Sequence, residues 1–140
     1  MSRIFWDTNL FIYLLEENPQ YAAKVRELRK KMIERKDQLI TSAMTLAEIQ
    51  VVPRRAGDAQ LAEFYRSSIK RASLIVPFDE AAADQFAEIR ANPSIQSADA
   101  VQLSCAAAAK ATIFITNDTQ LTRLKIPGID FVTTMDRLPF

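Results

Sequence analysis

Four acidic residues occupy positions at which carboxylates could act together: Asp7, Glu48, Asp99 and Asp118. Carboxylates that converge on one crevice repel each other, and a divalent cation relieves that repulsion. Hard oxygen ligands without histidine or cysteine favour Mg²⁺ or Mn²⁺ over zinc and copper. Mg²⁺ held by carboxylates typically acts on phosphate groups, where it neutralises phosphoryl oxygens and activates a water molecule. The four residues therefore predict metal-assisted phosphoryl chemistry, provided that the fold brings them together.

Three of these acids also have a purely structural explanation. Asp7 follows the apolar run IFW (4–6), and Asp118 follows IFIT (113–116) and Asn117, so either one could cap the helix after its strand. Asp99 lies in the first turn of a predicted helix, where it could complement the helix dipole. These explanations do not exclude a chemical role, and the case for chemistry is the set of four.

Glu48 is harder to explain structurally. Its predicted helix carries an apolar stripe at Met44, Ala47 and Val51, and Glu48 falls on the same stripe. A capping box with Thr45 is the alternative, but Ser42 is the better cap for this helix. A carboxylate on a buried stripe needs a positively charged partner, because its burial costs several kcal/mol. We therefore expect a cation to face Glu48.

The composition excludes several other kinds of site. The chain has no histidine and a single cysteine, Cys105, which rules out histidine-dependent triads, histidine ribonuclease chemistry and thiolate zinc sites. Its two glycines, Gly57 and Gly128, cannot build a glycine-rich phosphate loop. The net charge of +1 does not by itself indicate a nucleic-acid-binding protein. Catalysis would depend on carboxylates, hydroxyls, lysine and arginine.

The elements that would position these acids alternate along the chain. Short apolar runs predict strands at 3–7, 38–41, 74–77, 113–116 and 130–133. Helical patterns between them predict helices at 9–17, from Pro19 to Met32, at 42–52 ended by Pro53, at 58–71, 79–91 and 97–110, and a short helical turn at 118–124. This alternation favours an α/β fold, a three-layer α/β/α sandwich around a parallel sheet. Asp7 and Asp118 would then lie at carboxyl ends of strands, where such sheets place their sites.

Length and hydropathy predict one cytoplasmic domain. The 140 residues suit a single domain over 1–140 without an internal repeat or linker. No apolar segment approaches the ~20 residues of a membrane span, and the N-terminus has no signal-peptide pattern. We expect a cytoplasmic protein with no membrane association.

Four motifs in this order resemble the PIN domain family, and most closely the VapC-type toxins of toxin–antitoxin pairs. They are DTN (7–9), TSAMTLAE (41–48), SADAVQL (97–103) and FITND (114–118), and the resemblance covers about residues 4–136. It implies a parallel sheet of order 3-2-1-4-5 and a Mg²⁺- or Mn²⁺-dependent endoribonuclease. It also implies a homodimer or a toxin–antitoxin hetero-oligomer, silenced by a small antitoxin protein that binds near the first helices.

The resemblance assigns roles to particular residues. Asp7 and Asp99 would hold the metal, and Glu48 and Asp118 would complete the pocket directly or through water. The residues expected to orient these carboxylates are Thr8, Asn9, Thr116 and Asn117. One departure is Lys110-Ala111 before the fourth strand, where the family often has a glycine that caps the preceding helix.

RNA contacts and rival functions stay open at this point. Arg54 and Arg55 follow the helix of Glu48 and are the preferred candidate RNA contacts. The basic residues of the second helix are typical of a solvated helix face, with RNA contact as the alternative. A stand-alone RNA-processing PIN nuclease and a non-catalytic PIN module that only binds a partner are alternatives to the toxin. A phosphoacceptor receiver domain is disfavoured, because DFVTTMD (130–136) offers no lysine after the fifth strand.

Overall fold

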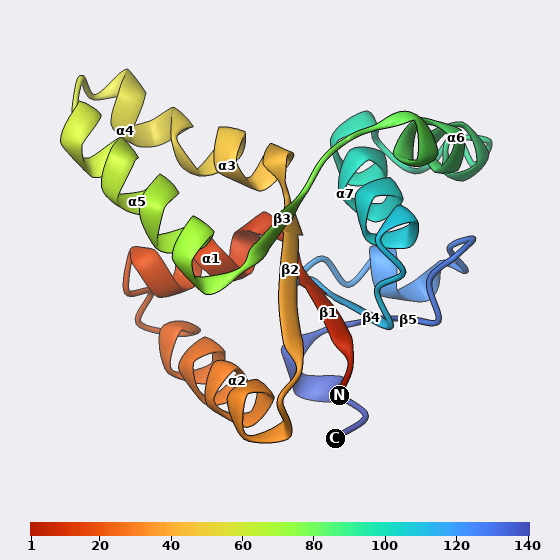
Figure 1. Ribbon diagram of the computed structural model, residues 1–140, viewed down its shortest axis with the longest axis horizontal. Helices are drawn as coiled ribbons and strands as arrows, with labels where there is room; N and C mark the ends of the chain where they lie inside the picture. The colour runs from red at the N-terminus through yellow and green to blue at the C-terminus, as the bar shows by residue number, and fades with distance from the viewer.

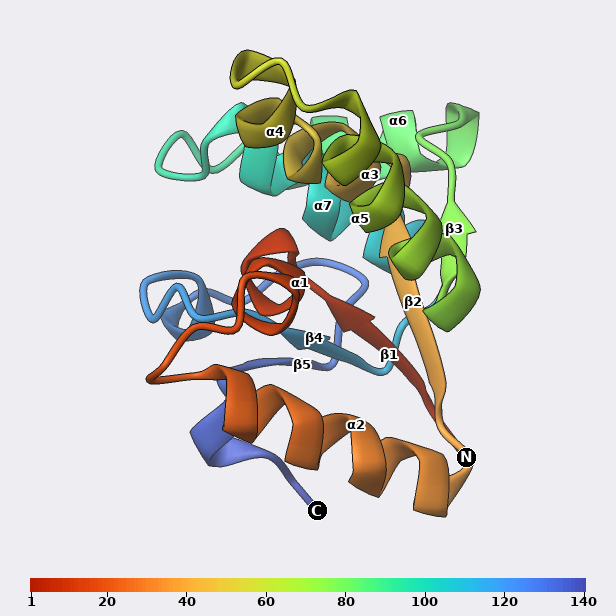
Figure 2. The same ribbon diagram turned by 90° about the vertical axis from the view of Figure 1, so that its left-hand side faces the viewer.

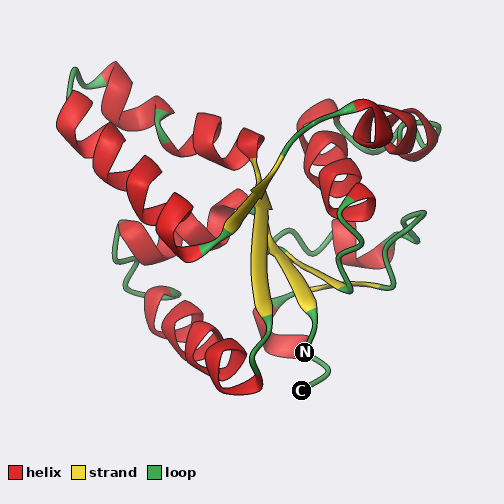
Figure 3. Ribbon diagram, viewed as in Figure 1, coloured by secondary structure: helices red, strands yellow, loops and turns green.

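A five-stranded parallel sheet forms the centre of the protein, which a computed structural model describes over all residues 1–140 (Figure 1). The sheet has the order β3-β2-β1-β4-β5, and every neighbouring pair is parallel. Its strands are β1 (Arg3–Trp6), β2 (Gln38–Ser42), β3 (Leu74–Val76), β4 (Ile113–Ile115) and β5 (Phe131–Thr133). The predicted fold class, strand positions and strand order are therefore confirmed. The strands fan out with the twist that parallel sheets adopt (Figure 3).

Helices cover both faces of this sheet. The α-helices are α1 (Thr8–Leu15), α2 (Ala22–Arg35), α3 (Ala43–Ile49), α4 (Val51–Arg55), α5 (Ala59–Ala72), α6 (Glu80–Ile89) and α7 (Ser97–Ala108). Two 3₁₀ turns, η1 (Leu121–Arg123) and η2 (Met135–Arg137), flank β5. None of these helices combines the length and the apolar character that crossing a membrane requires.

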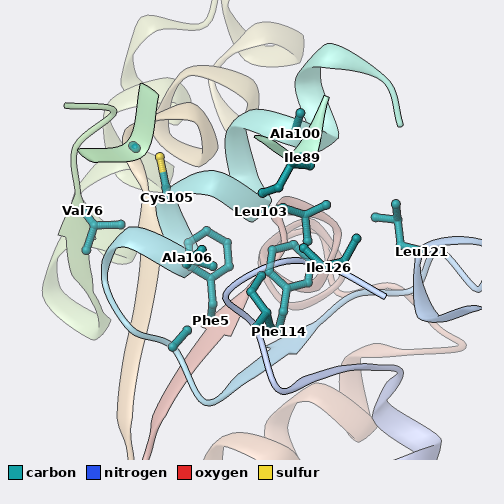
Figure 4. Close-up of a cluster of buried hydrophobic side chains, with 14 of the residues drawn as sticks. Phe5, Val76, Ile89, Ala100, Leu103, Cys105, Ala106, Phe114, Leu121 and Ile126 are labelled. Carbon is teal, nitrogen blue, oxygen red and sulfur yellow. The ribbon is translucent and has the colours of Figure 1, made fainter. Parts of the chain in front are cut away.

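The strands divide their side chains between two cores, because successive residues of a strand point to opposite faces. Phe5 and Phe114 pair across β1 and β4, with stacked rings 5.0 Å apart, and pack beneath Leu103 and Ala106 of α7 (Figure 4). The residues on either side of Phe5 in β1 face the second core, which packs against α1, α2, α3 and α5. On that face α1 lies between α2 and the group of α3 to α5 (Figure 2).

The second helix begins later than its sequence predicts. Pro19 is expected at its first turn, but α2 begins at Ala22. The Asn18 side chain accepts hydrogen bonds from the backbone N–H groups of Gln20 (2.9 Å) and Tyr21 (3.0 Å). This turn, typical of asparagine, places Pro19 before the helix and delays its start.

The third helix is also shorter than predicted. It ends at Ile49, and α4 begins at Val51 with Pro53 inside it. Proline is tolerated in the first turn of a helix, because the N–H groups there have no partner within the helix. Pro53 therefore belongs to a new short helix and does not end the one before it.

The predicted helical turn at 118–124 is limited to the 3₁₀ helix η1. The Asp118 side chain accepts a hydrogen bond from the backbone N–H of Gln120 (2.9 Å), and the Leu121 N–H bonds to the Asp118 carbonyl (3.2 Å). These bonds close a tight turn directly after β4, which leaves room for only three helical residues.

Candidate functional site

The pairing of β1 with β4 brings the first predicted site residues together. Trp6 and Ile115 are partners in the parallel register, so the residues that follow them emerge side by side. The backbone N–H of Asp7 donates to the Ile115 carbonyl at 2.9 Å. The Thr116 hydroxyl then donates to Oδ2 of Asp7 at 2.8 Å. Two segments more than a hundred residues apart thus meet at one edge of the sheet, as the parallel sheet requires.

The Asp7 carboxylate is fixed by three donors. Besides Thr116, the backbone N–H of Thr8 donates to Oδ1 at 2.9 Å and Nε2 of Gln102 approaches Oδ1 at 3.4 Å. The Thr8 bond makes Asp7 the N-cap of α1. An ionised carboxylate offers about four lone-pair positions, so Oδ2 keeps one of its two for a ligand.

Gln102 is the residue of this site that sequence reasoning missed. Its buried Nε2 lies 3.0 Å from the Thr8 hydroxyl and 2.8 Å from the Thr45 hydroxyl, and its Oε1 accepts from the Ser42 hydroxyl. The Thr8 hydroxyl in turn donates to Oε1 of Glu48 at 2.7 Å. Gln102 therefore links the residues around Asp7 to Glu48 through a chain of hydrogen bonds. Its signal in the sequence is a long polar side chain between the apolar residues Val101 and Leu103 of the Ala-rich helix.

Glu48 does not lie on a buried stripe, so this prediction is wrong. The buried residues of α3 are Thr45 and Ile49, whereas Ala47, Glu48 and Val51 are exposed. Val51 belongs to the next helix, and Thr45 turns inward because its hydroxyl joins the Gln102 network. An exposed carboxylate needs no counter-charge, and no lysine or arginine pairs with Glu48.

Asp99 projects from the first turn of α7 and accepts no hydrogen bond within the chain. Partial burial raises the pKa of Asp99 above its ordinary value. The negative charges of Asp7, Asp118 and Glu48 raise that pKa further. The carboxylate of Asp99 therefore interacts electrostatically with all three of the other predicted acids.

Burial also raises the pKa of Asp7, and the Asp118 charge adds to this effect. The hydrogen bonds from Thr116, Thr8 and Gln102 act in the opposite direction by stabilising the ionised form. The ion pairs of the chain involve Asp136, Asp37 and Glu63 only. The four predicted acids therefore form one electrostatic cluster without a balancing cation.

A cavity of about 460 Å³ lies between α1, α3, α4 and the start of α7. Asp7, Glu48 and Asp99 line it, together with Thr8 and Asn9. Oδ1 of Asn9 is a buried oxygen without a hydrogen-bond donor, while its Nδ2 reaches the Thr116 hydroxyl at 3.5 Å. Asp118 is not among the lining residues and belongs to the cluster through its charge.

The chemistry of this cluster fits a hard divalent cation. The available donors are carboxylate oxygens and an amide oxygen, which Mg²⁺ and Mn²⁺ prefer. Their mutual repulsion is uncompensated, which a cation would relieve. No three acidic or thiol side chains stand close enough together to enclose an ion as they are placed. Coordination by three or more of them therefore requires side-chain rotation toward the ion.

Asn117 differs from its predicted role. Its Nδ2 donates to the Tyr13 hydroxyl at 2.8 Å and contacts none of the four carboxylates. The side chain therefore ties α1 to the end of β4. Arg54 and Arg55 close α4 and do not line the cavity, and the Arg54 guanidinium bonds to Oε1 of Gln50 at 3.0 Å. A role of these arginines in RNA binding stays a prediction.

Solved structures with the same fold come from VapBC complexes. They include VapBC2 from Rickettsia felis bound to promoter DNA, with 18% identity, a TM-score of 0.77 and coverage of 94% of this chain and 98% of that chain. DNA-bound VapBC from Salmonella typhimurium has 18% identity, a TM-score of 0.76 and coverage of 96% and 99%. VapBC-5 from Mycobacterium tuberculosis, a member of the VapBC family of toxin–antitoxin systems, has 19% identity, a TM-score of 0.65 and coverage of 96% and 99%.

Sequence comparison gives the family directly. No curated protein matches the chain. The family model described as the PIN domain matches residues 4–127, which include all four acids of the cluster. The chain therefore belongs to the PIN domain family.

Proposed function

We propose that this protein is a Mg²⁺- or Mn²⁺-dependent endoribonuclease and the toxin of a type II toxin–antitoxin pair. The observation that carries the proposal is the uncompensated cluster of Asp7, Glu48, Asp99 and Asp118 at the carboxyl ends of β1 and β4. Membership of the PIN domain family and the likeness to chains of VapBC complexes support it.

In this proposal Asp7 and Asp99 hold the metal ion, and Glu48 and Asp118 complete the pocket directly or through water. When bound, the ion supplies charge neutralisation of the scissile phosphate and a water molecule of lowered pKa. The chain itself orients the Asp7 carboxylate through Thr116, Thr8 and Gln102, and these hydrogen bonds favour its ionised form against the effect of burial. Oδ2 of Asp7 keeps one lone pair that no hydrogen bond uses, which supports the assignment of Asp7 as a metal ligand.

Cleavage of labelled RNA in Mg²⁺, in Mn²⁺ and in EDTA tests the activity. We expect cleavage with either metal and none in EDTA. Asp99→Asn should lower the rate on the order of 100-fold, because a lost metal ligand removes about 3 kcal/mol of transition-state stabilisation. The control is Asp84→Asn, which removes an exposed carboxylate of α6 outside the cluster and should leave the rate unchanged.

Calorimetric titration with Mn²⁺ tests the ligand set independently of activity. Wild-type protein should bind the ion, and Asp99→Asn should bind it more weakly. Full cleavage by the Asp99→Asn variant would falsify the metal assignment. Metal binding without cleavage of any RNA would instead favour the alternative of a PIN module that only binds a partner.

The toxin assignment also proposes protein partners. The VapBC complexes with the same fold support an antitoxin, which we expect to be encoded by a small reading frame next to this gene. Co-expression should yield a stable complex without nuclease activity. A gene without such a neighbour would favour a stand-alone RNA-processing nuclease. A homodimer and a cytoplasmic location are further parts of the proposal.

A further inference from the structure

A second cavity, of about 720 Å³, opens at the carboxyl ends of β4 and β5. It lies between the residues that follow these strands, the 3₁₀ helix η1 and the chain that enters α2. Tyr21, Asn117, Arg123, Thr133 and Arg137 are among its lining residues. Its volume falls in the range of about 300–1,000 Å³ that small-ligand sites occupy. It is therefore large enough for a nucleotide.

Asn117 joins this cavity to the acidic cluster. It lies between Thr116, whose hydroxyl donates to Asp7, and Asp118, whose charge raises the pKa of Asp7. Consecutive Cα atoms are about 3.8 Å apart, so the Cα atom of Asn117 in the cavity wall lies at this distance from those of Thr116 and Asp118. A ligand made of linked units is therefore long enough to contact both the acids and this cavity.

Two guanidinium groups give the cavity its positive charge. Arg123 and Arg137 are exposed, and their side chains form no hydrogen bond or ion pair within the chain. The acidic lining residue Asp136 is paired with Lys24 at 3.0 Å. The free charge of the cavity is therefore positive, next to a negative cluster that repels phosphate. Guanidinium groups bind phosphate oxygens in a two-pronged geometry.

One wall of the cavity is aromatic. The Tyr21 ring stacks on Tyr13 with ring centres 4.6 Å apart and an interplanar angle of 29°. Tyr13 is held in turn by the hydrogen bond from Asn117 to its hydroxyl. Tyr21 is half-buried, and its stacking on Tyr13 holds the ring in place. Such a ring can stack with a nucleobase, because bases stack on aromatic rings independently of sequence.

We propose that this cavity is an RNA subsite that takes the nucleotide next to the cleaved phosphodiester. Arg123 and Arg137 bind its phosphates, and Tyr21 stacks on its base. This proposal rests on the proposed RNA substrate of the acidic cluster. It places the principal RNA contacts beside β5 and away from α4, the helix of Arg54 and Arg55 (Figure 1).

Binding of a fluorescein-labelled, mixed-sequence single-stranded RNA in EDTA tests the subsite without metal-dependent cleavage. The double variant Arg123→Gln/Arg137→Gln should bind this RNA at least tenfold more weakly than wild type. The slope of log Kd against log salt should fall by about 1.4, since each lost phosphate contact contributes about 0.7 for a single strand. The matched control is Lys70→Gln/Arg71→Gln, which removes two exposed positive charges of α5 that do not line the cavity.

Tyr21 supplies a second, independent variant. Tyr21→Phe keeps the ring and should bind the RNA like wild type, whereas Tyr21→Leu should lower the affinity roughly tenfold. Circular dichroism confirms that both variants fold. Equal affinities of the Phe and Leu variants would contradict base stacking at this position.

The outcomes separate the subsite from the nuclease. Weaker RNA binding by the double arginine variant supports the subsite even if the wild-type protein cleaves no RNA. The absence of cleavage would contradict the proposed nuclease activity alone. Normal cleavage with unchanged binding by that variant overturns the subsite and leaves the activity. If only the Arg54→Gln/Arg55→Gln variant loses RNA binding, the RNA contacts lie on α4 and the proposed subsite is wrong. A double arginine variant that keeps RNA but no longer binds the antitoxin identifies the cavity as a protein-binding surface and overturns the proposal.

Discussion

At the residue scale, Asp7 combines two roles that its sequence context presents as alternatives. Its Oδ1 caps α1, while its Oδ2 faces Thr116 and keeps a free lone pair. The cap is the means of orientation, because the hydrogen bond from the Thr8 N–H fixes the carboxylate relative to the end of β1. A capping aspartate at a strand end is therefore compatible with ligand function.

Asp99→Asn is expected to stabilise the metal-free protein near neutral pH. Burial and three neighbouring carboxylates raise the pKa of Asp99 above the unfolded value of 3.8. Because the native pKa is the higher one, the native state loses stability as pH rises from below 3.8 through the raised pKa. Asparagine avoids this loss. The gain is at most roughly 1 kcal/mol, since solvent screens a half-exposed side chain. Urea unfolding in EDTA measures it, and the gain should vanish as the pH falls below 3.8.

A divalent metal should reverse this order. Wild-type protein gains about 2.7 kcal/mol at a metal concentration 100-fold above Kd, and Asp99→Asn gains less. Asp84→Asn, in exposed α6 surface, should behave like wild type in both conditions. An Asp99→Asn variant that is less stable than wild type in EDTA would show that like-charge repulsion does not strain the cluster.

Residue-level prediction succeeded where strand pairing decides the contact. Asp7 and Thr116 follow paired strands, so a parallel sheet already places them together. The site role of Gln102 and the actual partner of Asn117 were not predicted, because their contacts depend on the rotation of a helix and on the position of α1. Those quantities depend on how the helices pack in three dimensions. The outward position of Glu48 has the same cause, since α3 ends before Val51.

At the element scale, hydrophobic patterns predicted the strands better than the helix ends. The five strands are short apolar runs with polar residues at their borders, and sheet burial keeps each in register. Helix ends depend on local hydrogen bonds. Asn18 forms a turn that excludes Pro19 from α2, and Pro53 lies in the first turn of a new helix. Neither feature follows from hydrophobic periodicity.

Lys110→Gly is expected to stabilise the protein by roughly 0.5–1 kcal/mol. Lys110 follows α7 with a φ of 59°, and its N–H bonds to the Ala107 carbonyl at 3.0 Å, so the glycine-type cap forms without glycine. A left-handed conformation strains a residue that has a Cβ atom, and glycine removes that strain. Urea unfolding measures the gain. Lys30→Gly, at an exposed position inside α2, should lose a similar amount. A destabilised Lys110→Gly variant would mean that the lysine side chain itself stabilises the end of α7.

At the scale of the whole molecule, the candidate binding cavities and the hydrophobic cores occupy different parts of the sheet. Both cores lie along the faces of the sheet, and both cavities described above open at the carboxyl ends of its strands. The acidic cluster and the arginines of the second cavity are therefore neighbours without sharing a core. Their opposite charges could not be located from the net charge of +1, because the positions of η1 and η2 depend on tertiary structure.

The proposed homodimer has a candidate surface on α5, which projects from the sheet beside α4 (Figure 1). Leu61 and Phe64 lie one turn apart on the outer face of α5 and are 37% and 56% exposed. Adjacent exposed apolar side chains are typical of protein interfaces. We expect Phe64→Glu to convert the dimer to a monomer, because dimer formation would bury an unpaired carboxylate.

Sedimentation velocity over a range of concentrations measures this change. Phe131→Glu is the matched control, since Phe131 is 53% exposed on the edge strand β5 and carries the same substitution. A wild-type protein that stays monomeric at every concentration contradicts the homodimer. Dissociation in Phe131→Glu with an intact dimer in Phe64→Glu would move the interface from α5 to the β5 edge of the sheet. That interface would cover the side of the molecule on which the RNA subsite is proposed, because Val132 and Thr133 of β5 line that cavity.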